Sequence, residues 1–514
     1  MTGKKNNEKK NLKLHVNAFE LLREIEESHL VDSIKLSDGT RLWNLIRIMI
    51  FYYFQKYDNT SFDGLGQQDF KKISLFHFIL ESLTMKYPNN IDFWGFSGTE
   101  SRKLWNGTSY DIYMDALYDV LGENFCVFEW PNEQGYRRRY EGKIYSKHYV
   151  SMSIPIASSA FWNILLYRLF KRKPSINNSD VLKNIMEEIS SNYAVDKEKL
   201  QKHIIESIVI FSNMKNLLRK LLEKKRPKVV FIRCGYGRFP MALSQACKEL
   251  DIPSVEVQHG FLNKYIPGYV KAVKSDNGDC IPSHMLTHGE IYSEIIKKGN
   301  IFDPAKVFTV GFPYLEKVKN AQPQITEDMK FFLSKYQKTI LVTSDYLLHI
   351  SSAVENFTIQ LSKLLKQHTT PIGILFKPHP ADKNEYSNLK KIDNIYVTDK
   401  YINTYELFKI SDIHSTVFST SAIEALAFSV PNIIIDIGEG YTENIQEIID
   451  QKSSFITKTV DHYIQILNVI FSDYDKASEN AVKKSMQYYQ PDALINFREF
   501  MKTMQKNCTK SVRE

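Results

Sequence analysis

The apolar residues divide the chain into a helical start and two later series of short strands that alternate with helices. Over residues 14–88 the apolar positions recur at helical spacing, and the apolar run 43–54 predicts a buried helix. Residues 1–13 are rich in lysine and asparagine and are expected to form a disordered basic tail. We therefore expect an N-terminal helical region ahead of the first α/β domain.

The first strand–helix series fills residues 89–318. A helical stretch at about 155–225 interrupts it, and turn residues or glycines follow the apolar runs. Strands that alternate with helices are typical of a parallel, doubly wound sheet. This region is therefore predicted to be a Rossmann-like domain with a helical insertion. Its expected strands are 91–96, 125–131, 229–233, 254–258, 284–288 and 306–311.

A second series of the same kind follows a polar, proline-containing linker at 319–328. Residues 329–514 are predicted to form a second Rossmann-like domain, which ends in helices from about residue 459. Two such domains joined by a linker predict an α/β fold with a ligand cleft between the domains. The expected strands of the second domain are 339–344, 373–380, 394–399, 412–417 and 432–437.

Composition and charge restrict the class of protein. Of 514 residues, 43% are hydrophobic and 25% are charged, and the net charge of +8 is modest for this length. We therefore expect a globular protein with an anionic ligand and no nucleic-acid partner. The five cysteines contain no CxxC pair, and no secretory signal is seen, so a cytoplasmic location is expected. The longest apolar run is shorter than the ~20 residues of a membrane span.

Residues 161–173 are amphipathic, rich in aromatic side chains and closed by a basic cluster. A helix of this kind can lie at the surface of an anionic membrane, which would make the protein peripheral to it. The same pattern also fits a core helix with a charged end. Both interpretations remain open at this point.

The first candidate site is the sequence Lys377-Pro378-His379-Pro380, at the end of a predicted strand. Ligands of doubly wound sheets bind at this edge, and lysine and histidine offer donors to a phosphate. The flanking prolines stiffen the loop. The alternative is a rigid turn with a surface histidine.

The second candidate runs from a strand into the helix 422–428 and carries Ser419, Thr420 and Ser421. Hydroxyls and backbone N–H groups at the start of a helix can bind phosphate. The alternative is a capping box formed by Ser421 and Glu424, which needs no ligand. Glu424 is also a candidate to accept hydrogen bonds from ribose hydroxyls.

The third candidate lies in the first domain, where Gln258-His259-Gly260 ends a strand. A histidine is a natural general base for a hydroxyl, and the glycine permits a sharp turn. Gln258, Gly260 and His288 are secondary candidates for this site. The alternative is a histidine that is hydrogen-bonded by the local backbone.

These motifs resemble those of GT-B glycosyltransferases of bacterial surface polysaccharides. The KPHP loop, the Ser/Thr-rich turn before Ile-Glu-Ala-Leu-Ala-Phe-Ser-Val-Pro and the upstream QHG are similar to the capsule-polysaccharide and CDP-glycerol glycerophosphotransferase-like group. Bacterial sialyl- and Kdo-transferases, which have an HP and a Ser/Thr motif, are similar too. The resemblance covers about residues 225–440. Where sialyltransferases have an acidic-acidic-glycine motif, this chain has QHG.

The resemblance implies a fold, a donor and a mechanism. It implies two Rossmann-like domains that face a cleft, and a CMP- or CDP-linked donor held by the HP and Ser/Thr motifs. It also implies that His259 takes the proton of the attacking hydroxyl of a glycan or lipid-linked glycan. Neither a metal nor a cofactor is expected. A UDP-sugar epimerase of the same architecture and a non-catalytic assembly partner are the alternatives.

Overall fold

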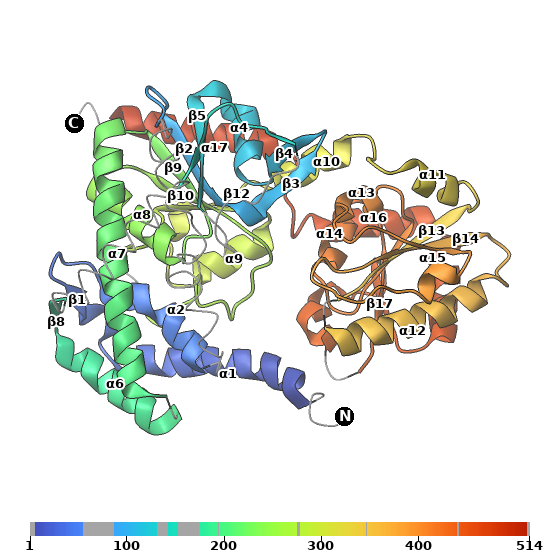
Figure 1. Cartoon of the computed structure of the whole chain (residues 1–514), viewed down its shortest axis with the longest axis horizontal. Coiled ribbons are helices and arrows are strands. Elements are labelled where there is room, and N and C mark those ends of the chain that lie inside the picture. The colour runs from blue at the N-terminus through green and yellow to red at the C-terminus, as the bar shows by residue number, and fades with distance from the viewer. Residues whose placement is uncertain are drawn as a thin grey trace, which may run out of the picture. The chain divides into compact units, whose positions relative to one another are not determined.

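The computed structural model describes residues 6–54, 87–130, 142–152, 174–193, 195–274, 278–345, 347–438 and 441–510. The chain forms two compact units (Figure 1). The first unit comprises Met1–Pro313 and Leu494–Glu514, and the second is the continuous segment Tyr314–Ala493. Each unit is built around one parallel sheet, and each is described by itself below.

The sheet of the first unit has seven parallel strands in the order β12-β11-β10-β9-β2-β5-β7. The first strand of this sheet in chain order, β2, therefore lies in its interior, and the sheet grows outwards from it in both directions. Such a reversal of strand order defines the switch point of a doubly wound sheet. It lies here between β2 and β9. The strands are β2 (Phe93–Gly98), β5 (Phe125–Trp130), β7 (Tyr149–Ser151), β9 (Val229–Arg233), β10 (Ser254–Val257), β11 (His284–Thr287) and β12 (Val307–Thr309).

Both faces of this sheet are buried, because alternate strand residues point into two different cores. On β9, Val230 and Ile232 face one core, whereas Val229 and Phe231 face the other. The first core includes helices α1, α2, α6, α7 and α8, and the second includes α4 and α17. The helices of this unit are α1 (Asn6–Ser28), α2 (Leu42–Phe54), α4 (Met114–Leu121), α6 (Ser179–Tyr193), α7 (Lys197–Lys225), α8 (Arg238–Glu249), α9 (Glu290–Lys298) and α17 (Ala493–Lys510).

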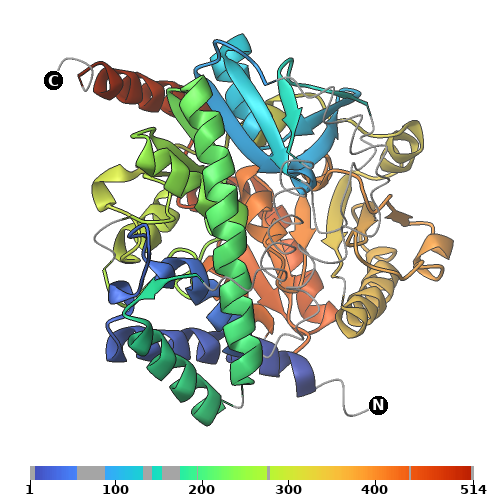
Figure 2. The same cartoon turned by 60° about the vertical axis from the view of Figure 1, so that its left-hand side comes forward.

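The N-terminal helices pack against the longest helix of the chain. Figures 1 and 2 show α7 running along the first unit, with α1, α2 and α6 gathered at one end of it. Asp196 caps α7 by accepting a hydrogen bond from the backbone N–H of Lys199. The smaller strands of the unit form a two-stranded and a three-stranded sheet. They are β1 (Lys35–Leu36) with β8 (Ile176–Asn177), and β3 (Arg102–Trp105), β4 (Thr108–Asp111) and β6 (Lys143–Ile144).

The second unit contains a six-stranded parallel sheet in the order β15-β14-β13-β16-β17-β18. Counted along the chain, this is the Rossmann order 3-2-1-4-5-6, with its switch point between β13 and β16. Its elements are β13 (Lys338–Thr343), β14 (Ile372–Lys377), β15 (Ile395–Val397), β16 (Ile413–Ser415), β17 (Asn432–Ile435), β18 (Ser454–Thr457), α10 (Pro313–Asn320), α11 (Glu327–Leu333), α12 (Leu348–Leu365), α13 (Thr404–Phe408), α14 (Ser421–Ala427), α15 (Val460–Ser472) and α16 (Tyr474–Ser485).

The structure confirms the predicted fold class, because both units are α/β with doubly wound parallel sheets. A strand is present at every position where the sequence predicts one. Strands β7 and β18 of the two main sheets and the short strands β1, β3, β4, β6 and β8 are additional. The expectation that the two sheets face a common cleft stays a prediction. Among the described residues, no helix combines the length and the apolar character needed to cross a bilayer.

The structure differs from the expected domain boundaries in three places. Residues 6–13, expected to be disordered, belong to α1. The expected linker 319–328 belongs to the second unit, where the Lys409 ammonium donates to the carbonyl oxygens of Ala321 and Gln322. Helix α17, expected in the C-terminal domain, packs its apolar side chains into the second core of the first unit. The amphipathic segment 161–173 lies outside the described residues.

Candidate active site

In the first unit, His259 lies just beyond the carboxyl end of β10, near the switch point of the sheet. Its imidazole is partly buried between two tyrosines. Nε2 is 3.2 Å from the Tyr236 hydroxyl, and Nδ1 is 3.3 Å from the Tyr269 hydroxyl. Burial, together with the nearby Arg233 guanidinium, lowers the pKa of His259 to about 3. The imidazole is therefore neutral at neutral pH, as a general base must be.

Glu256 lies on β10 itself, and the Tyr269 hydroxyl contacts both its carboxyl group and the His259 imidazole. The side chain of Glu256 is 1% exposed, and its Oε1 accepts a hydrogen bond of 2.6 Å from the Tyr269 hydroxyl. Burial raises the pKa of this carboxyl to about 7, against hydrogen bonds that favour its ionised form. One of those hydrogen bonds comes from the backbone N–H of Gly235. A Cβ at Gly235 would collide with Glu256 Oε2, so this close approach requires glycine.

The secondary candidates Gln258, Gly260 and His288 shape the loop that presents His259. Gln258 donates to the Gly260 carbonyl at 2.8 Å and accepts from the His288 backbone N–H at 2.7 Å, so it ties the end of β10 to the end of β11. Gly260 has a φ of +70°, which favours glycine. His288 is buried and stacks on Phe312 with ring centroids 4.4 Å apart. The structure thus gives Gln258 and Gly260 a positioning role.

Two charged side chains, Arg233 and Glu100, lie at the carboxyl ends of β9 and β2, at the same edge of the sheet as His259. Arg233, the last residue of β9, forms an ion pair with Glu100, which follows β2 across the switch point. Its guanidinium also lies over the Tyr113 ring, 5.5 Å from the centroid. Of these two charged groups, Arg233 acts on His259 and is one cause of its lowered pKa.

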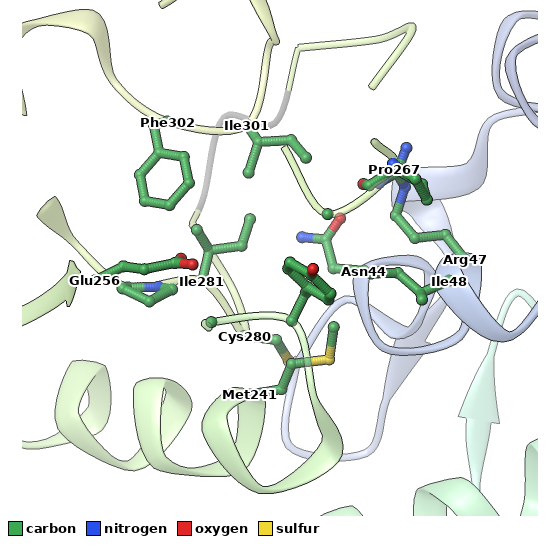
Figure 3. Close-up of a pocket in the computed structure, with 14 residues that line it drawn as sticks. Asn44, Arg47, Ile48, Met241, Glu256, Pro267, Cys280, Ile281, Ile301 and Phe302 are labelled. Atoms are coloured by element: carbon green, nitrogen blue, oxygen red, sulfur yellow. The ribbon is translucent and has the colours of Figure 1, made fainter. Parts of the chain in front are cut away.

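A small cavity lies behind Glu256 (Figure 3). The Glu256 side chain enters it from β10, whereas Asn44 and Arg47 enter it from α2. Its volume of about 20 Å³ holds about one water molecule, so it is too small for a nucleotide or a sugar. The cavity therefore belongs to the support of the site and is not a substrate pocket.

In the second unit, Lys377 and His379 lie where β14 ends, two strands away from β16. Lys377 is 5% exposed, and its ammonium donates to the carbonyl oxygens of Pro378 and Lys400, at 3.3 and 3.2 Å. His379 is partly buried, and its Nδ1 accepts a hydrogen bond from the Ala381 backbone N–H at 3.1 Å. That bond places the proton of the neutral ring on Nε2. Pro380 is exposed.

Two acidic residues that the sequence reasoning missed lie near this histidine. Asp345 follows β13 and Asp382 follows the KPHP loop. Burial lowers the pKa of His379, whereas both carboxylates oppose that shift. Asp382 also accepts a hydrogen bond from the buried Tyr386 hydroxyl, which is itself 2.7 Å from the Ser344 hydroxyl. The sequence did carry a signal for Asp345, because its carboxylate directly follows the predicted strand 339–344, which ends in Thr-Ser.

The Ser/Thr motif divides into a buried part and an accessible part. The Ser421 hydroxyl is turned into the protein, 3.2 Å from that of Thr343 and 3.4 Å from His414 Nε2. His414 Nδ1 is 2.8 Å from Asn432 Oδ1, so this network ties three strands to α14. Ser421 is therefore engaged in the core. The capping box of Ser421 and Glu424 is not formed either, because the N-cap of α14 is Thr420, whose side chain makes no capping hydrogen bond.

Ser419, Thr420 and Glu424 remain on the outer side of the motif. Thr420 is exposed, and the Ser419 hydroxyl accepts a hydrogen bond of 3.2 Å from the Ser421 backbone N–H. Glu424 accepts a hydrogen bond of 2.8 Å from the buried Tyr405 hydroxyl. These side chains follow β16, and Lys377 ends β14, on the two sides of β13. The carboxyl ends of all three parallel strands lie at one edge, as the sequence predicted.

Comparisons with known proteins show similarity at the level of the fold. No protein-family model matches it, and no curated protein matches its sequence. Similar solved structures include S. aureus MnaA with UDP (13% identity, 80% of this chain and 96% of that one, TM-score 0.46). A second is a putative UDP-N-acetylglucosamine 2-epimerase from Listeria monocytogenes (14% identity, 81% of this chain and 97% of that one, TM-score 0.49). A third is the wall teichoic acid polymerase TagF (12% identity, 89% of this chain and 100% of that one, TM-score 0.45). The chain itself is defined by its fold, as a two-unit α/β protein with Rossmann-like sheets.

Proposed function

We propose that this protein is a glycosyltransferase that moves a sugar or a polyol phosphate from a nucleotide-activated donor to a hydroxyl of a glycan. The observation that carries the proposal is the imidazole of His259, which is held between the Tyr236 and Tyr269 hydroxyls just beyond the carboxyl end of β10, near the switch point of the first sheet. A general base for a hydroxyl needs an uncharged nitrogen at an edge where ligands bind. His259 meets both conditions.

The second unit would bind the donor. His379 carries a proton on Nε2 that can be donated to a phosphate oxygen, and the Lys377 ammonium adds positive charge at the same strand end. Ser419 and Thr420 add hydroxyls across β13. In this proposal, the phosphate that leaves with the nucleotide is stabilised by these donors. The Glu424 carboxylate would accept from the ribose hydroxyls while it also accepts from Tyr405.

In the chemical step, the acceptor hydroxyl loses its proton to His259 as its oxygen bonds to the anomeric carbon or the phosphorus of the donor. The bond from that atom to the nucleotide phosphate breaks, and the electron pair leaves with the phosphate. We keep a CMP- or CDP-linked donor, a lipid-linked or free glycan acceptor, and a place in capsule or lipopolysaccharide synthesis as parts of the proposal. A peripheral membrane location belongs to it as well.

A second function, epimerisation of a UDP-sugar, is favoured by one observation. His259 is a base at an edge where ligands bind, and it is linked through the Tyr269 hydroxyl to the buried Glu256 carboxyl. A base that can take a proton from a hydroxyl can also take one from a sugar carbon, which is the step that an epimerase needs. An epimerase converts the donor with no acceptor present, whereas a transferase leaves it unchanged or hydrolyses it slowly. Analysis of the products from donor alone therefore separates the two functions.

The decisive experiment is a thermal-shift panel of CMP-, CDP-, UDP- and GDP-linked compounds, followed by transfer assays with the stabilising donor. We expect one nucleotide class to raise the melting temperature. His379→Ala should lose this shift, and His259→Ala should keep it but lose transfer. His462→Ala, which changes an exposed histidine of α15, is the matched control. An unshifted melting temperature with every compound would refute the proposal and favour a non-catalytic assembly partner. Full donor binding by His379→Ala would remove His379 from the donor site.

A further inference from the structure

Three side chains in the first unit form a continuous row that ends on His259. Oε1 of Glu256 accepts from the Tyr269 hydroxyl at 2.6 Å, and the same hydroxyl oxygen lies 3.3 Å from His259 Nδ1. Glu256 and Tyr269 are both almost fully buried, at 1% and 0% exposure. Neither side chain reaches the open edge of the sheet, so any effect on a substrate has to pass through His259.

The protons of this row can be assigned from its donors and acceptors. An ionised carboxylate only accepts hydrogen bonds, so the single proton of Tyr269 points to Glu256. The tyrosine oxygen is then an acceptor towards His259, and Nδ1 must carry the proton of the neutral ring. Nε2 is left with its lone pair. The Tyr236 hydroxyl, 3.2 Å away, donates to that lone pair as the hydroxyl of an acceptor would.

We propose that Glu256 and Tyr269 are positioning residues that hold the proton of His259 on Nδ1 and so make Nε2 the atom that accepts the proton of the attacking hydroxyl. The proposal rests on His259 being the base of the proposed transfer. In the step, the O–H bond of the acceptor breaks and an Nε2–H bond forms. No proton needs to move along the row, because the Glu256 carboxylate stabilises the imidazolium through the oriented Tyr269 hydroxyl.

The surrounding structure holds the row in place. Tyr269 lies in a loop whose backbone is fixed from α2, where the Arg47 guanidinium donates to the carbonyl oxygens of Pro267 and Val270. Glu256 is fixed from the other side by the N–H of Gly235, at a position where a side chain would not fit. A carboxylate buried so completely is costly unless each hydrogen bond is made. The hydrogen bonds from Tyr269 and Gly235 therefore stabilise the buried Glu256 carboxylate, which apolar packing alone would disfavour.

The row also makes the base sensitive to pH through Glu256. When Glu256 is protonated, it donates to the Tyr269 oxygen, Tyr269 donates to Nδ1, and the ring proton moves to Nε2, which can no longer accept. The groups that face the row are Tyr236, Cys234 and Arg47 around Glu256, and Arg233 and His288 around His259. Because burial raises the pKa of Glu256 to about 7, transfer should fall below about pH 7 as this carboxyl gains its proton.

The first test reads the tautomer and needs no activity. In protein labelled with ¹⁵N-histidine, long-range ¹H–¹⁵N correlation at pH 8 should show His259 protonated on Nδ1, with His259→Gln used to assign the signal. Tyr269→Phe should lose this preference, whereas Tyr236→Phe, which changes the hydroxyl on the Nε2 side, should retain it. A wild-type ring protonated on Nε2 at pH 8 would overturn the proposal, whatever the protein catalyses.

The second test is the pH profile of transfer. Glu256→Gln should remove the acidic limb near pH 7 and lower kcat at pH 8 by roughly 10- to 100-fold, with KM for the donor unchanged. Tyr236→Phe should keep the limb. If Glu256→Gln retains the limb, the row does not control the base, although the transferase function stands. If transfer is absent but the Nδ1 tautomer is found, the proposed function fails and the assignment of the row survives.

Discussion

Arg47 offers the sharpest test of how the N-terminal helices support the site. Its guanidinium is 3% exposed and pairs at 2.7 Å with the fully buried Glu26 carboxylate. Glu26 also accepts hydrogen bonds from the Trp43 indole at 2.9 Å and from the Ala272 backbone N–H at 2.8 Å. In Arg47→Met the carboxylate would stay buried with its counter-charge removed, while the side-chain volume is largely retained.

We expect Arg47→Met to lower the free energy of unfolding of the first unit by about 3–5 kcal/mol, the usual cost of removing one partner of a buried ion pair. In the double variant Glu26→Gln/Arg47→Met, the neutral amide still accepts from Trp43 and Ala272. The double variant should therefore be more stable than Arg47→Met by about 1–3 kcal/mol. Arg23→Met, which removes an arginine whose ion pairs are exposed, is the matched control, with an expected change within about 0.5 kcal/mol.

The assay is urea unfolding followed by tryptophan fluorescence. All five tryptophans of the sequence lie before residue 314, so their emission reports only on the first unit. Comparison of Arg47→Met with Glu26→Gln/Arg47→Met separates the stability lost through the unpaired buried charge of Glu26 from the stability lost through poorer packing at residue 47. Equal stabilities for Arg47→Met and Arg23→Met, or a double variant no more stable than Arg47→Met, would contradict the argument.

Three further predictions follow from other contacts. Burial lowers the pKa of His414 to about 4, so its contribution to stability is complete above pH 6.5 and is lost as the pH falls towards 4. Hydrogen exchange of β16 should show this loss in the wild type and a flatter profile in His414→Gln. Gly235→Ala should destabilise the first unit by about 1–3 kcal/mol and shift Glu256, because the new Cβ meets its carboxyl, whereas Gly237→Ala, with its nearest neighbour at 3.3 Å, should not. Unfolding curves compare the two variants, and equal values would refute the steric argument. Lys377→Met should weaken donor binding by roughly tenfold or more in calorimetry, since a charged donor is lost, and unchanged affinity would remove Lys377 from the site.

The strands could be predicted because each one carries a local signal. A buried parallel strand is a short apolar run bounded by turn residues, and residues 229–233 and 372–377 have this pattern whatever surrounds them. The placement of α17 carries no such signal. Its pattern shows which face is buried, but not that Phe497 and Phe500 complete a core begun by Phe93 and Phe125, about 370 to 410 residues earlier in the chain.

The candidate site was predictable in its position and less so in its detail. Strand ends meet at one edge, so His259, His379 and Ser419 could be placed from their order in the chain. Partners that come from distant parts of the chain leave no local pattern. Ser421 reads as a capping residue or a phosphate ligand until His414 and Thr343 are seen to engage its hydroxyl. Tyr269, although only ten residues from His259, reads as an ordinary aromatic residue of a loop.

The return of the chain to its first unit sets an order in which the protein can fold during synthesis. The second unit is one continuous segment, so all of its contacts are available before the last helix leaves the ribosome. The first unit must wait, because four side chains of α17 belong to one of its two cores. Until they arrive, Phe231 and its neighbours on that face of the sheet lack their cover, and this stage is the one most exposed to chaperones and to aggregation. A ribosome-bound chain that ends at residue 493 and is followed by a flexible spacer long enough to span the exit tunnel should therefore carry a folded second unit behind an incomplete first one.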